Sequence, residues 1–143
     1  MGDDLASANV NRSYSLAASC IAIFTFLLFF LYPRFASGEI NAWLYQATLV
    51  VMGVATFSFV FATLCYYGSS LGARMEEAER AANARRGDRF WLAGYTLLFL
   101  APSLVLSTVR LLAVAAVWFG LWLVYLVFVI RYFPRIRTGR TGA

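Results

Sequence analysis

Four long stretches without a charged side chain constrain this sequence more than any other feature. They cover approximately residues 14–32, 42–67, 90–107 and 111–130. In a helix, about 20 residues at 1.5 Å per residue cross the roughly 30 Å hydrocarbon core of a bilayer. Inside that core the backbone must satisfy its own hydrogen bonds, which only helices and closed barrels achieve. The stretches therefore predict an all-α chain, an integral membrane four-helix bundle, rather than a soluble domain.

The composition agrees with a lipid environment. Hydrophobic residues make up 62% of the 143 residues and charged residues 13%, whereas soluble domains hold roughly 45–50% apolar and about 25% charged residues. A water-soluble domain of this size buries only part of its surface and would expose much of this apolar material to water. We therefore expect a single four-span transmembrane domain over residues 1–143, solvated largely by membrane lipid.

The segments between the stretches predict how the helices are separated. Turns are expected at residues 37–39 and near residues 107–110. Residues 68–89 form a loop that holds a short solvated helix, because residues 73–86 are rich in helix-forming residues, with acids early and arginines late. Within that loop, Gly87–Asp88 is typical of a helix break followed by an N-terminal cap for the third span.

A proline inside the third span predicts a kink. Pro102 has no N–H group, so one backbone carbonyl of the preceding turn loses its partner. Ser103 or a neighbouring helix is expected to satisfy that carbonyl.

The arginines predict the orientation. All 12 basic residues are arginine, and only Arg34 and Arg110 lie in the two short loops on one side. The others lie in the N-terminal segment, the 68–89 loop and the Arg-rich tail 131–143. Cytoplasmic segments carry an excess of basic residues. We therefore expect two helical hairpins in the plasma (inner) membrane, with both termini and the 68–89 loop in the cytoplasm.

Few side chains suited to chemistry occur in the chain. Histidine is absent, which removes the commonest general base and metal ligand. No Asp, Glu or Lys interrupts a span, although proton-coupled transporters usually hold such a group there. Cys20 and Cys65 lie in apolar stretches and are expected to be small buried hydrophobes. We expect a non-enzymatic protein without a metal, a cofactor or a nucleic acid partner.

Pairs of small residues four apart allow two membrane helices to approach closely. The chain holds three such pairs of interest, in its first, second and fourth spans. They are Ala18 and Ala22, Ser58 and Ala62, and Ala116 and Gly120. The pairs predict sites of helix packing, either within the chain or against a second protein.

Aromatic side chains gather on the other side of the fourth span. At 100° per residue, Trp118, Trp122 and Tyr125 lie opposite the small pair of that span. One interpretation is a face that accepts a hydrophobic ligand or a partner helix. The interpretation we favour is packing within the chain, with the indole N–H groups bonded to hydroxyls such as Thr56 or Ser103. Five hydroxyls of the first two spans are expected to bond their own i−4 carbonyls rather than to line a path: Thr25, Thr48, Thr56, Ser58 and Thr63.

Three arginines of the 68–89 loop, Arg80, Arg85 and Arg86, offer contacts to a cytoplasmic partner or to anionic lipid. The alternative, which we favour, is a solvated charged segment that enforces the topology.

These features predict an interaction protein: an accessory or assembly subunit of a membrane complex that associates with itself or with a larger membrane protein. The alternative is an oligomeric channel or facilitator whose path forms between protomers, because four short helices alone enclose little space. A second alternative is a binder of a lipid or a quinone-like hydrophobic ligand at Trp118 and Trp122.

Overall fold

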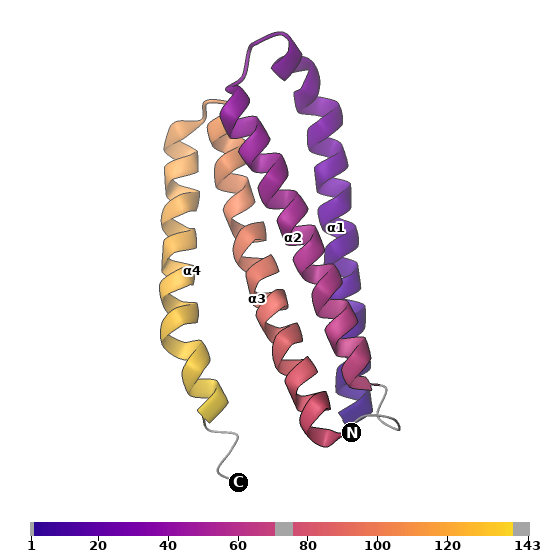
Figure 1. The fold of residues 1–143 in the computed structure, drawn as a ribbon. Helices are drawn as coiled ribbons and strands as arrows, with labels where there is room; N and C mark the ends of the chain where they lie inside the picture. Colours follow the sequence, from indigo (N-terminus) through magenta and orange to yellow (C-terminus); the bar gives the residue numbers. More distant parts are fainter. Residues whose placement is uncertain (1, 71–75, 139–143) are drawn as a thin grey trace.

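The computed structural model describes residues 2–70 and 76–138, with side chains for residues 7–70 and 76–131, and builds them from helices and short turns. The helices are α1 (Gly2–Ala36), α2 (Ala42–Ser70), α3 (Glu77–Thr108) and α4 (Leu112–Thr138) (Figure 1). All four are long and apolar enough to cross a membrane, as the uncharged stretches predict. The chain thus has the architecture of a multi-pass membrane protein.

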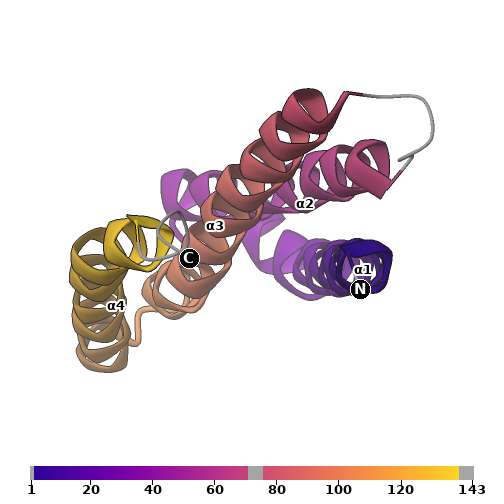
Figure 2. The ribbon, with the colours of Figure 1, turned by 90° about the horizontal axis from the view of Figure 1, so that it is seen from below.

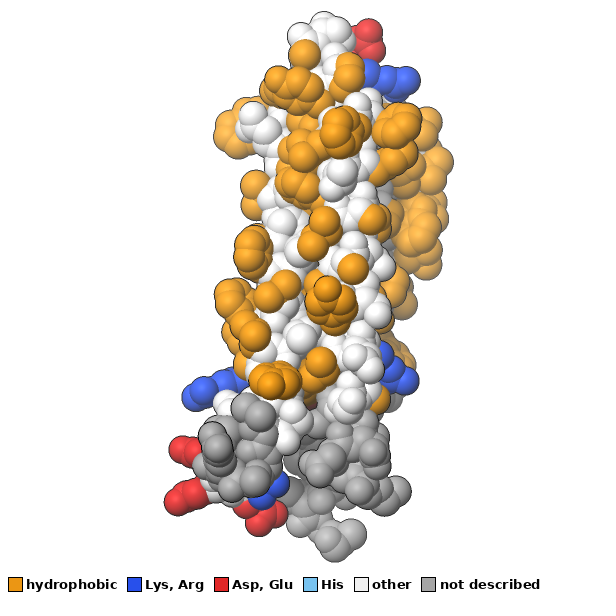
Figure 3. Space-filling model, turned by 90° about the vertical axis from the view of Figure 1, so that its right-hand side faces the viewer, with side chains coloured by type: hydrophobic (Ala, Val, Ile, Leu, Met, Phe, Trp, Pro, Cys, Tyr) orange, Lys and Arg blue, Asp and Glu red, His pale blue; other side chains and the backbone are white. Residues whose placement is uncertain are grey.

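Successive helices run in opposite directions. α1 and α3 begin, and α2 and α4 end, at one end of the molecule, which we call the base (Figure 1). On the face drawn in Figure 3, hydrophobic side chains cover the length of the molecule, and charged side chains lie near its two ends. This distribution suits a slab of hydrocarbon between two polar layers.

The turn between α1 and α2 depends on one glycine and one asparagine. The chain reverses at Gly38, whose φ of 76° is readily adopted by glycine. Asn41 then caps α2, because its side-chain Oδ1 accepts a hydrogen bond from the Leu44 backbone N–H at 3.1 Å. Between α3 and α4 the chain turns at residues 109–111, close to the predicted position.

The central segment differs from the prediction. A separate helix over residues 73–86 with a break at Gly87–Asp88 is wrong for the described residues, because α3 runs unbroken across both; residues 71–75 lie outside the described part. Gly87 faces the Tyr66 ring of α2, from which a Cβ at this position would lie 2.9 Å away. Asp88 lies inside the helix and accepts a hydrogen bond from the Tyr66 hydroxyl at 2.8 Å. Both residues therefore contact α2, and neither ends a helix.

A seven-residue repeat joins α2 to α3. On α2 the repeat consists of large side chains that are at most 5% exposed: Tyr45, Met52, Phe59 and Tyr66. On α3 it consists of small buried residues: Gly87, Gly94, Ala101 and Thr108. A Cβ on Gly94 would lie 2.9 Å from the Phe59 ring, so the two repeats run antiparallel in one register. We call this contact the α2–α3 seam.

Packing every seven residues is typical of helices that cross at a shallow left-handed angle of about 20°. Small residues on α3 let its backbone approach the rings of α2, and the resulting dispersion contacts hold helices together in lipid. α1 presents a comparable face to α2, with five residues buried: Ser13, Ala17, Cys20, Leu27 and Leu31. The core of the molecule therefore lies on both sides of α2.

The helices pack in chain order rather than as a closed bundle. α1 packs on α2, α2 on α3, and α3 on α4. Figure 2 shows α4 beside α3 at the edge of the molecule. The predicted four-helix bundle is thus a body of α1, α2 and α3, to which α4 is attached through α3.

Replacing Gly94 with alanine is expected to destabilise the protein. The added Cβ would lie 2.9 Å from the buried Phe59 ring, so the ring or the helix must shift at a cost of about 1–3 kcal/mol. Gly53→Ala is the matched control, because nothing lies within 4 Å of its Cβ position and alanine favours a helix over glycine by about 1 kcal/mol. Thermal unfolding in detergent should give a lower Tm for Gly94→Ala alone. Equal Tm values for the two variants would contradict the seam.

Candidate functional site

α4 is the helix with the most unused surface. In its most apolar part 6% of the residues are buried, against 17–33% in the other three helices. Among the described side chains of α4, Ala115 alone is fully buried. The helix therefore contacts the rest of the protein along one side, and its opposite side is open.

Side-chain hydrogen bonds attach α4 to α3. The Ser103 hydroxyl donates to the Ala115 carbonyl at 3.2 Å, and the Trp122 indole N–H donates to the Thr96 carbonyl at 2.9 Å. A hydrogen bond between membrane helices contributes about 0.6 kcal/mol on average. The two bonds lie at different levels along α4, so they hold the helix alongside α3 rather than at a single point.

The aromatic side of α4 lies toward α3. Trp118, Trp122 and Tyr125 line a groove of about 160 Å³ together with Phe99 and Leu121, and the Phe99 and Tyr125 ring centroids are 5.1 Å apart. The predicted hydroxyl partner is wrong for Trp122, whose indole N–H bonds a backbone carbonyl instead. Ligand sites usually measure about 300–1,000 Å³. Trp122 and Tyr125 therefore pack toward α3, whereas Trp118 stays partly exposed, and the groove is small for a ligand.

The small-residue pairs divide into one buried and two exposed pairs. Ser58 and Ala62 are buried on α2. The exposed pairs are Ala18 and Ala22 on α1 and Ala116 and Gly120 on α4. Nothing lies within 4 Å of a Cβ built on Gly120. The pair on α4 thus forms an open strip opposite the side that holds α3; we call it the open side of α4.

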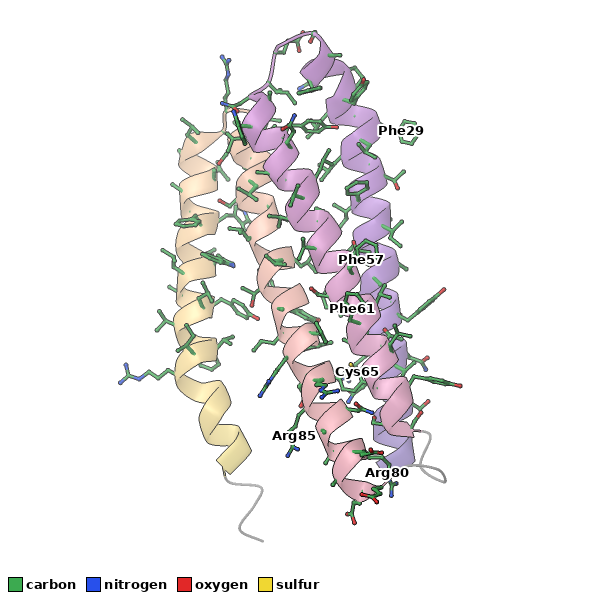
Figure 4. The ribbon with its side chains drawn as sticks, in the orientation of Figure 1. Phe29, Phe57, Phe61, Cys65, Arg80 and Arg85 are labelled. Carbon is green, nitrogen blue, oxygen red and sulfur yellow. The ribbon has the colours of Figure 1, made fainter. Side chains whose placement is uncertain are left out.

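The basic residues of the predicted loop lie on the first turns of α3. Arg85 and Arg86 are exposed, and Figure 4 shows Arg80 and Arg85 near the base of that helix. Arg80 is partly buried, and its Nε has no hydrogen-bond partner within the described residues. These arginines are therefore held on a helix that continues into the span, rather than on a separate segment.

Three residues take roles that the sequence did not predict. The sequence predicts that Ser103 or a neighbouring helix satisfies the carbonyl freed by Pro102, but the Ser103 hydroxyl donates across to α4. Tyr66 and Asp88 join α2 to α3 near the base. The seven-residue spacing of large residues on α2 and small ones on α3 is the signal from which the seam could have been found.

No protein-family model, curated protein or solved structure matches this chain. The arrangement of its own side chains is therefore the basis for inferring a function. Its most distinctive feature is a helix that is fixed to the body along one side and open along the other.

Trp122→Phe is expected to loosen α4 without disturbing the α2–α3 seam. The substitution removes the hydrogen bond to the Thr96 carbonyl, a loss of about 0.6 kcal/mol, while the phenyl ring still fills most of the space. Trp118→Phe is the control, because Trp118 is 40% exposed. Hydrogen exchange measured in detergent should become faster in α4 for Trp122→Phe alone. Unchanged exchange in that variant would show that the indole does not hold the helix.

Proposed function

We propose that this protein is a non-enzymatic accessory or assembly subunit of a membrane complex, which binds itself or a larger membrane protein through the open side of α4. The observation that carries the proposal is the two-sidedness of this helix. Trp122 is bonded to α3, while Ala116 is exposed and Gly120 has open space around it on the opposite side.

The physics of helix association in lipid supports this use of α4. Lipid tails are as apolar as leucine, so exposed apolar side chains alone do not drive helices together. Close backbone approach at small residues does, because it adds dispersion contacts that lipid chains cannot match. Val117 and Val124 flank Gly120 and are 62% and 66% exposed. They form one ridge along the same side of the glycine, against which a partner helix can pack.

The hydroxyl groups of α2 favour a subunit over a channel. Four of them donate to the backbone carbonyl four residues earlier, at 2.7–2.9 Å: Thr48, Thr56, Ser58 and Thr63. Their donors are therefore used within the helix, as the sequence predicts. An oligomeric channel would need a polar lining from other groups.

The arginines support a location in the plasma (inner) membrane with the base in the cytoplasm. Arg12, Arg85 and Arg86 lie toward the base, whereas Arg34 in the last turn of α1 and Arg110 in the turn after α3 lie at the other end. An excess of basic residues is typical of the cytoplasmic side. In this orientation both termini are cytoplasmic.

Gly120→Leu tests the open side of α4. The new side chain enters open space, so the fold and the Tm are expected to stay unchanged. A partner backbone packed at this position would be overpacked by about 1–3 kcal/mol, which lowers the association constant by about 5- to 140-fold. Gly53→Leu is the matched control, because its Cβ position on α2 is equally open. Native mass spectrometry from mild detergent measures the assembled fraction of each variant.

The outcomes separate the three functions. Loss of assembly in Gly120→Leu, but not in Gly53→Leu, supports docking through α4. Equal assembly in both variants contradicts it. A discrete homo-oligomer that conducts ions in liposomes would favour the channel instead, and a retained small molecule lost on changing Trp118 and Trp122 would favour the ligand binder.

A further inference from the structure

A second groove lies near the base, away from α4. Residues of α1 and α3 line it: Asn11, Arg12, Ser15, Leu16, Trp91 and Tyr95. Its volume is about 560 Å³, within the roughly 300–1,000 Å³ of ligand sites. The groove exists because α1 and α3 each pack on α2 rather than on one another, which leaves a furrow between them.

The aromatic wall of this groove is held in place by the α2–α3 seam. The ring centroids of Trp91 and Tyr95 are 4.3 Å apart. Tyr95 in turn meets the buried Phe59 ring edge-on, with centroids 5.7 Å apart. Because Phe59 is fixed against Gly94, the wall belongs to the rigid body of the molecule.

The lining changes from polar to apolar with depth. On α1, Asn11 and Arg12 lie nearest the base, and Leu16 lies about one helical turn, roughly 6 Å, beyond Arg12. On α3, Tyr95 lies the same distance beyond Trp91. Tryptophan and arginine at such a level are typical of the boundary between headgroups and hydrocarbon. The groove is therefore polar near the base and apolar farther into the membrane, which matches the order of groups in a phospholipid.

The charge of the lining selects an anion. Arg12 is the one charged residue among the six that line the groove, and it is exposed. A guanidinium binds phosphate oxygens through paired N–H groups more strongly than a neutral donor does. The amide of Asn11 and the hydroxyl of Ser15 stand on the same helix and can donate to the same headgroup.

We infer that this groove binds one anionic phospholipid from the leaflet at the base. Its phosphate lies at Arg12, and an acyl chain follows Leu16, Trp91 and Tyr95 into the membrane. The bound lipid fills the furrow between α1 and α3 and so joins the two helices that do not pack on each other. This site is separate from α4 and does not depend on the function proposed for that helix.

The test uses the full chain reconstituted into phosphatidylcholine nanodiscs with a fixed minor fraction of phosphatidylglycerol. After transfer to mild detergent, native mass spectrometry counts the lipids that remain on the protein. The wild-type protein is expected to retain one phosphatidylglycerol in preference to phosphatidylcholine. Arg12→Gln should lower that preference about five-fold, since one arginine near an anionic surface contributes about that factor.

Two further variants make the result specific to the groove. Arg89→Gln removes an exposed arginine near the same end that does not line the groove, so it should retain the wild-type preference. Ser15→Trp fills the groove without changing its charge, so it should lose the lipid. Equal preference in Arg12→Gln and the wild-type protein, or an equal loss in Arg12→Gln and Arg89→Gln, would overturn the inference.

Fluorescence quenching tests whether the lipid lies beside the aromatic wall. Phosphatidylglycerol with brominated acyl chains should quench tryptophan fluorescence more in the wild-type protein than in Trp91→Phe. Brominated phosphatidylcholine should quench the two proteins to similar extents. Identical quenching of both proteins by the brominated anionic lipid would contradict the assigned position of the chain.

Discussion

Two aromatic rings of α2 lie against two glycines of α3, and the positions of the other helices depend on this contact. Tyr66 covers Gly87 and Phe59 covers Gly94, each at a distance that a Cβ would reduce to 2.9 Å. In lipid no hydrophobic effect separates buried from exposed apolar surface, so the closeness of packing decides which helix faces meet. The hydrogen bond from the Tyr66 hydroxyl to Asp88 adds a directional contact at the base.

The position of α3 links the two proposed sites. Its seam side faces α2, a second side holds α4 through Ser103 and the Thr96 carbonyl, and Trp91 and Tyr95 form a wall of the groove beside α1. Because α4 has α3 as its main neighbour, its open side remains available. Because α1 and α3 share α2 as a neighbour, a furrow remains between them. Both features follow from helices packed in a row rather than in a ring.

The sequence predicts those parts of the fold that depend on local chemistry. The four spans and the turn near residues 107–110 are visible as missing charges and changes in polarity. Gly87 and Asp88 mislead, because glycine followed by aspartate is typical of a helix break, while contact with Tyr66 keeps the helix continuous. The Trp122 partner is a backbone carbonyl. Every residue has such a carbonyl, so the sequence does not identify this partner. Both seven-residue repeats are present in the sequence, but neither predicts a contact until the large residues of α2 are matched with the small residues of α3.

Disulfide cross-linking of one designed cysteine pair tests the register of the seam most directly. In a chain with Cys20→Ala and Cys65→Ala, the register places Met52→Cys opposite Ala101→Cys, and both positions belong to one buried cluster. Bridged residues need Cα atoms about 4.4–6.8 Å apart, so this pair should form a disulfide on oxidation in membranes. The pair Met52→Cys with Thr108→Cys, one repeat farther along α3, should remain reduced. A disulfide in the second pair and none in the first would contradict the seam and the arrangement of helices built on it.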